Sequence, residues 1–261
     1  MMVDVVKSSD GMDKVILKEP RGSTVQVHLF GGQVTSWKNE RAEELLFMSS
    51  KAIFKPPKAI RGGIPVCFPQ FSNIGTLEQH GFARNRFWSI DPDPPPLPAS
   101  SIKKAVIDLL LKPNEDDLRI WPHIEVRVEG LETLDYLDNL SERERFTEQG
   151  DALTFDSEVD RIYLSTPTKI AIIDHEKKRT FVLKKDGLPD AVVWNPWEKR
   201  AKAITDLGDD DYKHMLCVEA AAIGKPITLK PGEEWKGRQE LSAVPSSYFS
   251  GQLDPGRVLN G

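Results

Sequence analysis

Two stretches of the sequence concentrate residues that could bind a small anionic ligand. The segment 61–70 begins Arg-Gly-Gly, and the segment 79–84 reads Gln-His-Gly-Phe-Ala-Arg. Arg61 and Arg84 carry permanently charged, forked donors that suit a phosphate group or neighbouring hydroxyls, and His80 can donate or accept a proton near neutral pH. The glycine pair after the first arginine would let a ligand approach the backbone closely. A solvated loop with a hydrogen-bonded histidine explains the same residues, and spacing alone favours that structural interpretation.

Two carboxylates are candidates for chemistry on such a ligand. Glu219 interrupts the apolar run 216–222, where a desolvated carboxylate would have a raised pKa and could act as a general base. An outward-facing strand position explains it equally well, because Val218 and Ala220 would then face the core. Asp160 could hold ligand hydroxyls or pair with a nearby cation, and the ion pair is the more frequent case.

Short runs of β-branched and aromatic residues, separated by turns, must position these groups. The runs cover residues 14–18, 24–30, 33–37, 105–111, 124–128, 169–173 and 180–183. With little helical periodicity between them, they predict an all-β fold, a large antiparallel β-sandwich. Gly31-Gly32 is typical of a hairpin, and one short helix is expected near 209–212. The motif 195–197, Asn-Pro-Trp, could support a pocket wall, although structural packing of its tryptophan is at least as favourable.

We expect one domain over residues 1–261, with two interruptions of regular structure. The segment 91–98 holds five prolines in eight residues, which excludes a helix or a central strand and indicates a surface loop. Residues 246–261 lack periodicity and are expected to form a flexible tail.

The composition argues against several classes of protein. A net charge of −5 argues against a general nucleic-acid or anionic-membrane binder, but it allows a local basic pocket. Cys67 and Cys217 each lie in an apolar run, look buried and form no disulfide framework, which indicates a reducing compartment. The N-terminus does not resemble a signal peptide, and no apolar stretch approaches the roughly 20 residues of a membrane helix. We therefore expect a cytoplasmic protein.

Motifs for cofactors and metals are also missing from the sequence. It contains no phosphate-binding P-loop, no dinucleotide-binding turn and no nucleophile elbow. Its five histidines lack the spacing of metal ligands. We expect neither a cofactor nor a metal.

Four stretches, taken together and in order, resemble the aldose 1-epimerase superfamily. More narrowly, they resemble its glucose-6-phosphate 1-epimerase (hexose-6-phosphate mutarotase) branch in a plant-like form. The stretches are residues 59–65, 79–85, 193–197 and 217–219, within a similarity that runs from about residue 14 to about residue 244. The resemblance implies a galactose-mutarotase-like β-supersandwich. It also implies that the α and β anomers of a hexose 6-phosphate interconvert by acid–base ring opening and closure, without a cofactor.

By motif position, the resemblance assigns roles to individual residues. Glu219 matches the general base, and His80 matches a histidine that hydrogen-bonds the sugar. The positions that match substrate-binding residues are Arg61, Gln79, Arg84 and Asp160. The implied partner is a small sugar phosphate, with no nucleic acid and no membrane, and we expect a monomer.

The sequence departs from the family pattern at the general acid. That histidine normally lies in a His-Thr-Tyr-Phe-like motif upstream of a Val-x-Gly-Leu stretch, but here residues 118–123 run directly into 124–131. The family pattern indicates a gap of roughly 40 to 50 residues, which is several strands of about 5–6 residues with their turns. His123 lies at the junction in a Trp-Pro-His context that matches a different position, so it receives no role.

The missing segment has consequences for both the fold and the activity. We expect an incomplete sandwich and an impaired catalyst, because losing a general acid costs about 10²–10⁴ in rate. Two alternatives stay open: a non-catalytic phosphosugar-binding β-sandwich and a truncated inactive isoform.

Overall fold

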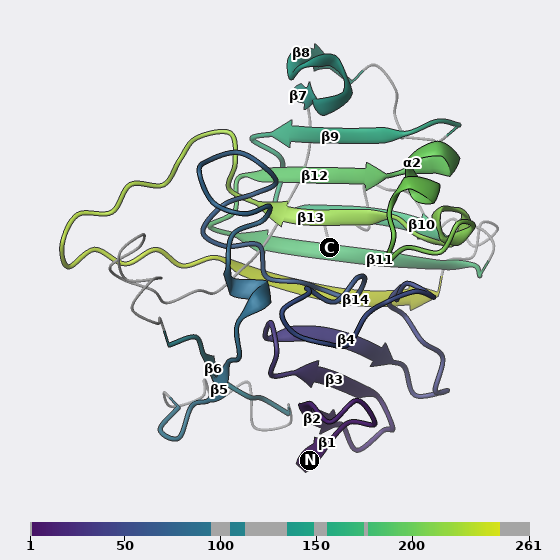
Figure 1. Cartoon of the computed structure of the whole chain (residues 1–261), viewed down its shortest axis with the longest axis vertical. Helices are drawn as coiled ribbons and strands as arrows, with labels where there is room; N and C mark the ends of the chain where they lie inside the picture. The colour runs from purple at the N-terminus through teal and green to yellow at the C-terminus, as the bar shows by residue number, and fades with distance from the viewer. Residues whose placement is uncertain (1, 95–104, 113–134, 149–155, 175–176, 246–261) are drawn as a thin grey trace. The chain divides into compact units, whose positions relative to one another are not determined.

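The computed structural model describes residues 2–94, 105–112, 135–148, 156–174 and 177–245. Within these ranges the chain is mostly strand and loop (Figure 1), and every strand pair is antiparallel. The sheet orders are β1-β2-β3-β4, β10-β11-β14, β13-β12-β9-β7-β8 and β5-β6. The all-β antiparallel prediction is therefore confirmed. Among the described helices, none has both the length and the apolar character to cross a membrane.

The first strands belong to the four-stranded and two-stranded sheets. They are β1 (Met2–Lys7), β2 (Asp13–Lys18), β3 (Thr24–His28), β4 (Gln33–Lys38), β5 (Ser89–Ile90) and β6 (Leu109–Leu110). The later strands are β7 (Asp135–Asp138), β8 (Glu144–Thr147), β9 (Val159–Leu164), β10 (Lys169–Asp174), β11 (Arg179–Asp186), β12 (Asp190–Asn195), β13 (Cys217–Ala221) and β14 (Arg238–Pro245). The helical segments are α2 (Trp197–Ala203) and the 3₁₀ turns η1 (Ala83–Asn85), η3 (Asn139–Ser141) and η4 (Asp211–His214).

The chain divides into two compact units. The first comprises Met1–Glu125 with Lys202–Asp211, and the second comprises Val126–Ala201 with Tyr212–Gly261. The expected single domain over 1–261 stays a prediction. The later part of the proline-rich segment, the junction around residue 123 and the expected tail at 246–261 lie outside the described residues.

The first unit is organised by the meander β1 to β4. The predicted hairpin at Gly31-Gly32 is confirmed, and both glycines adopt positive φ angles of 81° and 56°. The second glycine pair serves a different purpose from the one expected. A Cβ at Gly63 would lie 2.1 Å from the carbonyl oxygen of Val34, and one at Gly62 would lie 2.7 Å from Met48 Cα. These glycines therefore admit the chain's own backbone rather than a ligand.

The second unit is a sandwich of a five-stranded and a three-stranded sheet. Buried residues from both sheets form one hydrophobic cluster: Tyr136, Tyr163, Leu183 and Ala191. Partly buried apolar side chains pack against it, including Ile170 and Leu241 of the three-stranded sheet and Val218 and Ala220 of β13. This arrangement buries one face of each sheet, as the alternation of apolar and polar residues requires.

The helix prediction was right in part. The short helix expected near 209–212 is a 3₁₀ turn at Asp211–His214, and the α-helix at Trp197–Ala203 was not predicted. Gly208 donates its N–H to the carboxylate of Asp211 at 2.7 Å, so this carboxylate closes the turn before the helical residues begin. The two cysteines, expected to be buried, are each only partly buried.

Asn195 fastens the connection between α2 and β13. Its Nδ2 donates to the carbonyl oxygens of Tyr212 and Met215, both at 2.9 Å, and its Oδ1 accepts from the N–H of Trp197 at 2.9 Å. The ring of Trp197 lies 5.4 Å from that of Tyr212. The motif at 195–197 therefore has the structural role that was one of the two alternatives.

Replacing Asn195 with alanine should lower the free energy of unfolding by about 2–4 kcal/mol, because it leaves buried backbone groups without partners. Urea unfolding followed by tryptophan fluorescence measures the change. Asn73→Ala at an exposed position is the control. A loss below about 0.5 kcal/mol, the usual size of a surface effect, would contradict this structural role.

Candidate active site

A cavity of about 550 Å³ in the first unit brings two of the predicted arginines together. Its charged lining residues are the cations Lys58, Arg61, Arg84 and Arg86 and the carboxylates Glu78 and Asp206. Among the described lining residues, positive charges therefore exceed negative ones by two. This balance suits a phosphate monoester, which carries close to two negative charges at neutral pH.

Arg61 is held in place by a carboxylate that no sequence motif indicates. Its Nη2 and Nε donate to Asp206 Oδ1 at 3.1 and 3.2 Å. The side chain of Asp206 is only 11% exposed, whereas that of Arg61 is 32% exposed. The pair therefore fixes the guanidinium while leaving part of it open to the cavity.

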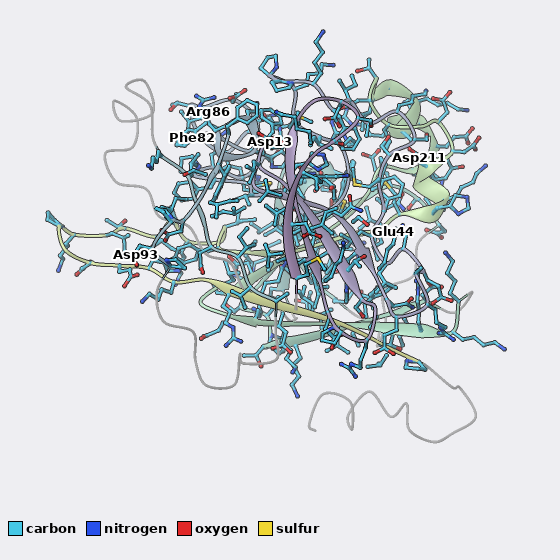
Figure 2. All side chains as sticks on the ribbon, turned by 90° about the horizontal axis from the view of Figure 1, so that it is seen from below. Asp13, Glu44, Phe82, Arg86, Asp93 and Asp211 are labelled. Atoms are coloured by element: carbon cyan, nitrogen blue, oxygen red, sulfur yellow. The ribbon has the colours of Figure 1, made fainter. Side chains whose placement is uncertain are left out.

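Arg84 lies in η1, and its own loop orients it. Its Nη2 donates to the carbonyl oxygen of Gln79 at 2.8 Å. The contact that the structure gives Gln79 is thus made by its backbone, and its side chain is exposed outside the cavity lining. Arg86, a further lining cation, lies beside Phe82 (both labelled in Figure 2). Its guanidinium carbon is 5.7 Å from the centre of the Phe82 ring. Sequence motifs had not indicated Arg86 or Lys58.

His80 accepts a backbone hydrogen bond and lies outside the residues that line the cavity. Its Nδ1 accepts the N–H of Ser72 at 3.1 Å, so the hydrogen of the neutral ring is assigned to Nε2. Burial, with the charges of Arg84 and Arg61, lowers the pKa of His80 from 6.5 to about 4. A neutral imidazole can donate Nε2–H to a ligand oxygen, but it is a poor general acid.

The lowered pKa of His80 predicts how stability depends on pH. The folded chain binds fewer protons at this ring than the unfolded chain between pH 4 and 6.5. The stability that the neutral ring contributes is therefore complete above pH 6.5 and is lost as the pH falls toward 4. The difference in unfolding free energy between the wild type and His80→Gln, from urea titrations at about pH 7 and about pH 5, should fall at the lower pH. An unchanged difference, or an imidazole that titrates above pH 6.5 by NMR, would contradict it.

Glu219 in the second unit faces away from the hydrophobic cluster. On β13 it lies opposite Val192 of β12, which in turn lies opposite Ile162 of β9. Residues directly opposite in an antiparallel sheet share a face, and Val192 and Ile162 are 1% and 0% exposed. Glu219 is therefore outward with respect to the sandwich core, yet it lies beside buried apolar neighbours and is itself half-buried. The prediction of a desolvated carboxylate and the prediction of an outward-facing strand position were thus each partly right.

Asp160 projects from the same face of this sheet as Glu219. It lies opposite Trp194 of β12, which lies opposite Cys217 of β13. Figure 1 shows β9, β12 and β13 side by side. Two strand spacings across the sheet and two residues along it separate the two Cα atoms by about 12 Å. From that spacing, the two carboxylates can address different ends of one small ligand.

An amide, rather than a cation, orients the carboxylate of Asp160. Asn139 Nδ2 donates to Asp160 Oδ1 at 2.7 Å, and the neighbouring Arg161 instead pairs with Glu148 at 3.1 Å. Burial is the main cause that raises the pKa of Asp160, and the charge of Asp138 adds to it, while the bond from Asn139 acts in the opposite direction. The simple ion pair expected as the alternative does not occur among the described residues.

The family model described as aldose 1-epimerase matches residues 13–124 and 121–242 of this sequence. The chain belongs to the aldose 1-epimerase family. A protein of Cenchrus ciliaris named "Putative glucose-6-phosphate 1-epimerase" is 59% identical over 305 positions, covering 99% of this chain and 93% of that one. An Escherichia coli protein of the same name is 25% identical, covering 81% of this chain and 84% of its own.

The fold of this family member agrees with solved structures. The crystal structure of a "putative mutarotase" from Salmonella typhimurium superimposes with a TM-score of 0.78, covering 93% of this chain and 97% of that one. At 22% identity, the likeness establishes the fold alone. The supersandwich expected from the resemblance is thereby confirmed.

The comparisons also bear on the gap predicted in the middle of the chain. The two matched ranges meet at residues 121–124, which is the junction where the family's histidine motif was expected. The alignment with the Cenchrus protein covers 305 positions, whereas this chain has 261 residues. At least 44 aligned positions, 305 minus 261, therefore have no residue in this chain.

Proposed function

We propose that this epimerase-family chain interconverts the α and β anomers of D-glucose 6-phosphate. The observation that carries the proposal is the cavity lined by Arg61 and Arg84, with its excess of positive charge. An unphosphorylated aldose would give these cations no anion to bind. The name of the Cenchrus relative supports the same substrate.

Glu219 acts as the base in the proposed mechanism. Its carboxylate removes the proton of the C1 hydroxyl, the bond between C1 and the ring oxygen breaks, and the ring oxygen takes up a proton. After rotation about the C1–C2 bond, the C5 hydroxyl attacks the other face of C1 and gives its proton back to water, while Glu219 returns its proton to O1. Asp160 accepts hydrogen bonds from sugar hydroxyls, His80 donates Nε2–H to a sugar oxygen, and Arg61 and Arg84 bind the phosphorylated end. Gln79 remains a proposed binding residue from the resemblance.

The source of the second proton limits the proposed rate. The family's general-acid histidine has no counterpart in this sequence, and the neutral ring of His80 does not replace it. Water then protonates the ring oxygen, and we expect turnover about 10²–10⁴ below that of a complete acid–base pair. The same missing group favours one second candidate, a non-catalytic phosphosugar-binding protein.

Comparing three sugars by exchange NMR tests the proposal. Glucose 6-phosphate should exchange its anomers faster with the protein than without it, whereas unphosphorylated glucose should gain little. Glucose 1-phosphate is the negative control, because its C1 oxygen carries the phosphate and has no hydroxyl proton to lose. Binding of glucose 6-phosphate without any acceleration would favour the second candidate.

The remaining proposals concern location and association. We propose a cytoplasmic monomer that takes a sugar phosphate and no nucleic acid or membrane as its partner. The net charge of −5 supports this. Light scattering of the purified chain tests the monomer.

A further inference from the structure

One buried serine holds the backbones of Arg61 and Asp206 together. Ser49 is 7% exposed. Its N–H donates to the carbonyl oxygen of Arg61 at 3.2 Å, and its Oγ donates to that of Asp206 at 2.7 Å. The two members of the ion pair therefore come from distant parts of the sequence but share one fixed support.

The loop that carries Asp206 is fastened beyond this residue as well. Leu207 is completely buried. The carboxylate of Asp211 (labelled in Figure 2) accepts the N–H groups of Gly208 at 2.7 Å and Ser50 at 3.0 Å. A carboxylate on so restrained a loop presents its oxygens in one place, unlike an exposed surface ion pair.

Asp206 changes the cavity in two ways at once. Its charge offsets one of the cations, which weakens the attraction of the cavity for every anion alike. Its two hydrogen bonds also fix the plane of the Arg61 guanidinium, so the remaining N–H groups point in set directions. Inorganic phosphate is attracted by the positive charge whatever the orientation of the guanidinium. A sugar phosphate also has sugar oxygens at a fixed distance from its phosphate, and these can accept from N–H groups that point in set directions.

We propose that Asp206 is a positioning residue that fixes Arg61 and thereby makes the cavity select a sugar phosphate over inorganic phosphate. This inference rests on the proposed function, because it takes glucose 6-phosphate as the ligand. In this role, Asp206 lowers the affinity of the cavity for anions in general and raises its selectivity for the sugar phosphate.

Titration calorimetry with two ligands, glucose 6-phosphate and inorganic phosphate, tests the role of Asp206. Asp206→Ala removes the oxygen that accepts both bonds from Arg61. Its Kd for glucose 6-phosphate should rise about tenfold, as expected for loss of a charge-assisted positioning contact, while the Kd for inorganic phosphate should stay unchanged or fall. The ratio of the Kd for inorganic phosphate to the Kd for glucose 6-phosphate should therefore drop at least about tenfold. In an Arg61→Ala background, the same change should alter the ratio less than about twofold, because coupled residues do not act additively. Asp209→Ala, on the same loop but paired with Lys51 at the surface, is the matched control.

Each other outcome is decisive. An unchanged ratio in Asp206→Ala, or an equal drop with and without Arg61, would overturn the inference and leave the proposed function standing. A wild type that does not bind glucose 6-phosphate would overturn the proposed function, and the inference with it. If Asp206→Ala does not fold, Arg61→Lys removes the forked donor from the other side and should lower the ratio similarly. An unchanged ratio there would also overturn the inference.

Discussion

Replacing Glu219 with glutamine should reduce anomer exchange of glucose 6-phosphate to the spontaneous rate, a loss of about 10²-fold or more. Glutamine keeps the size of the side chain and an oxygen that accepts hydrogen bonds, but it cannot take up a proton at neutral pH. The position is half-buried beside Val192, and a side chain of the same size keeps the packing there. Binding of the sugar phosphate should stay nearly unchanged. Saturation-transfer NMR gives the rate, and calorimetry gives the Kd.

The control for Glu219 is a carboxylate on another strand of the same unit. Glu240 of β14 is exposed and pairs with Lys184 at 3.4 Å. Glu240→Gln should exchange anomers like the wild type. Undiminished exchange in Glu219→Gln would remove this residue from the base role. A large rise in Kd with unchanged exchange at saturation would make it a binding residue instead.

Replacing Arg84 with alanine should raise the Kd for glucose 6-phosphate by about 10- to 100-fold, as for a lost hydrogen bond to a charged group. Arg84 is fixed by the carbonyl oxygen of Gln79 and lines the cavity with Arg61. In the proposed complex, its guanidinium would therefore meet the phosphate already oriented. Calorimetry measures the Kd, and exchange at saturating substrate should change much less, because the residue binds rather than moves a proton.

The matched control for Arg84 is an exposed arginine of the same unit. Arg41 pairs with Glu43 at 3.6 Å and its side chain is 77% exposed. Arg41→Ala should leave the Kd unchanged. An unchanged Kd in Arg84→Ala would show that this residue does not bind the sugar phosphate. An equal rise in both variants would show that the effect comes only from the change in net charge.

The strands that could be predicted are those with an apolar face in the core. The runs at 14–18 and 169–173 alternate in this way, and β2 and β10 are found there. β8 has only exposed side chains, so no buried face marked it in the sequence. The helix α2 has seven residues, which is too short for a helical period to show.

Site residues that belong to a recognisable local motif could be predicted from the sequence. Site residues that act through a long-range contact could not. Arg61 and Arg84 stand out because forked cations occur beside glycines in short motifs. Asp206 was missed because its partner Arg61 is 145 residues away in the sequence, and no local pattern connects them. Asn139 was missed for the same reason: the pairing of β7 with β9 brings it to Asp160. Such positioning residues can be identified only from the structure, because the fold rather than the spacing in the sequence brings them to their partners.

The central claim is that this chain, without the family's general-acid histidine, still opens the ring of glucose 6-phosphate with Glu219 as the base. The most direct measurement is saturation transfer between the two anomers of glucose 6-phosphate, with and without the purified, folded chain. We predict exchange above the spontaneous rate that increases in proportion to protein concentration. No acceleration by a sample that binds glucose 6-phosphate would contradict the claim and leave a sugar-phosphate binder.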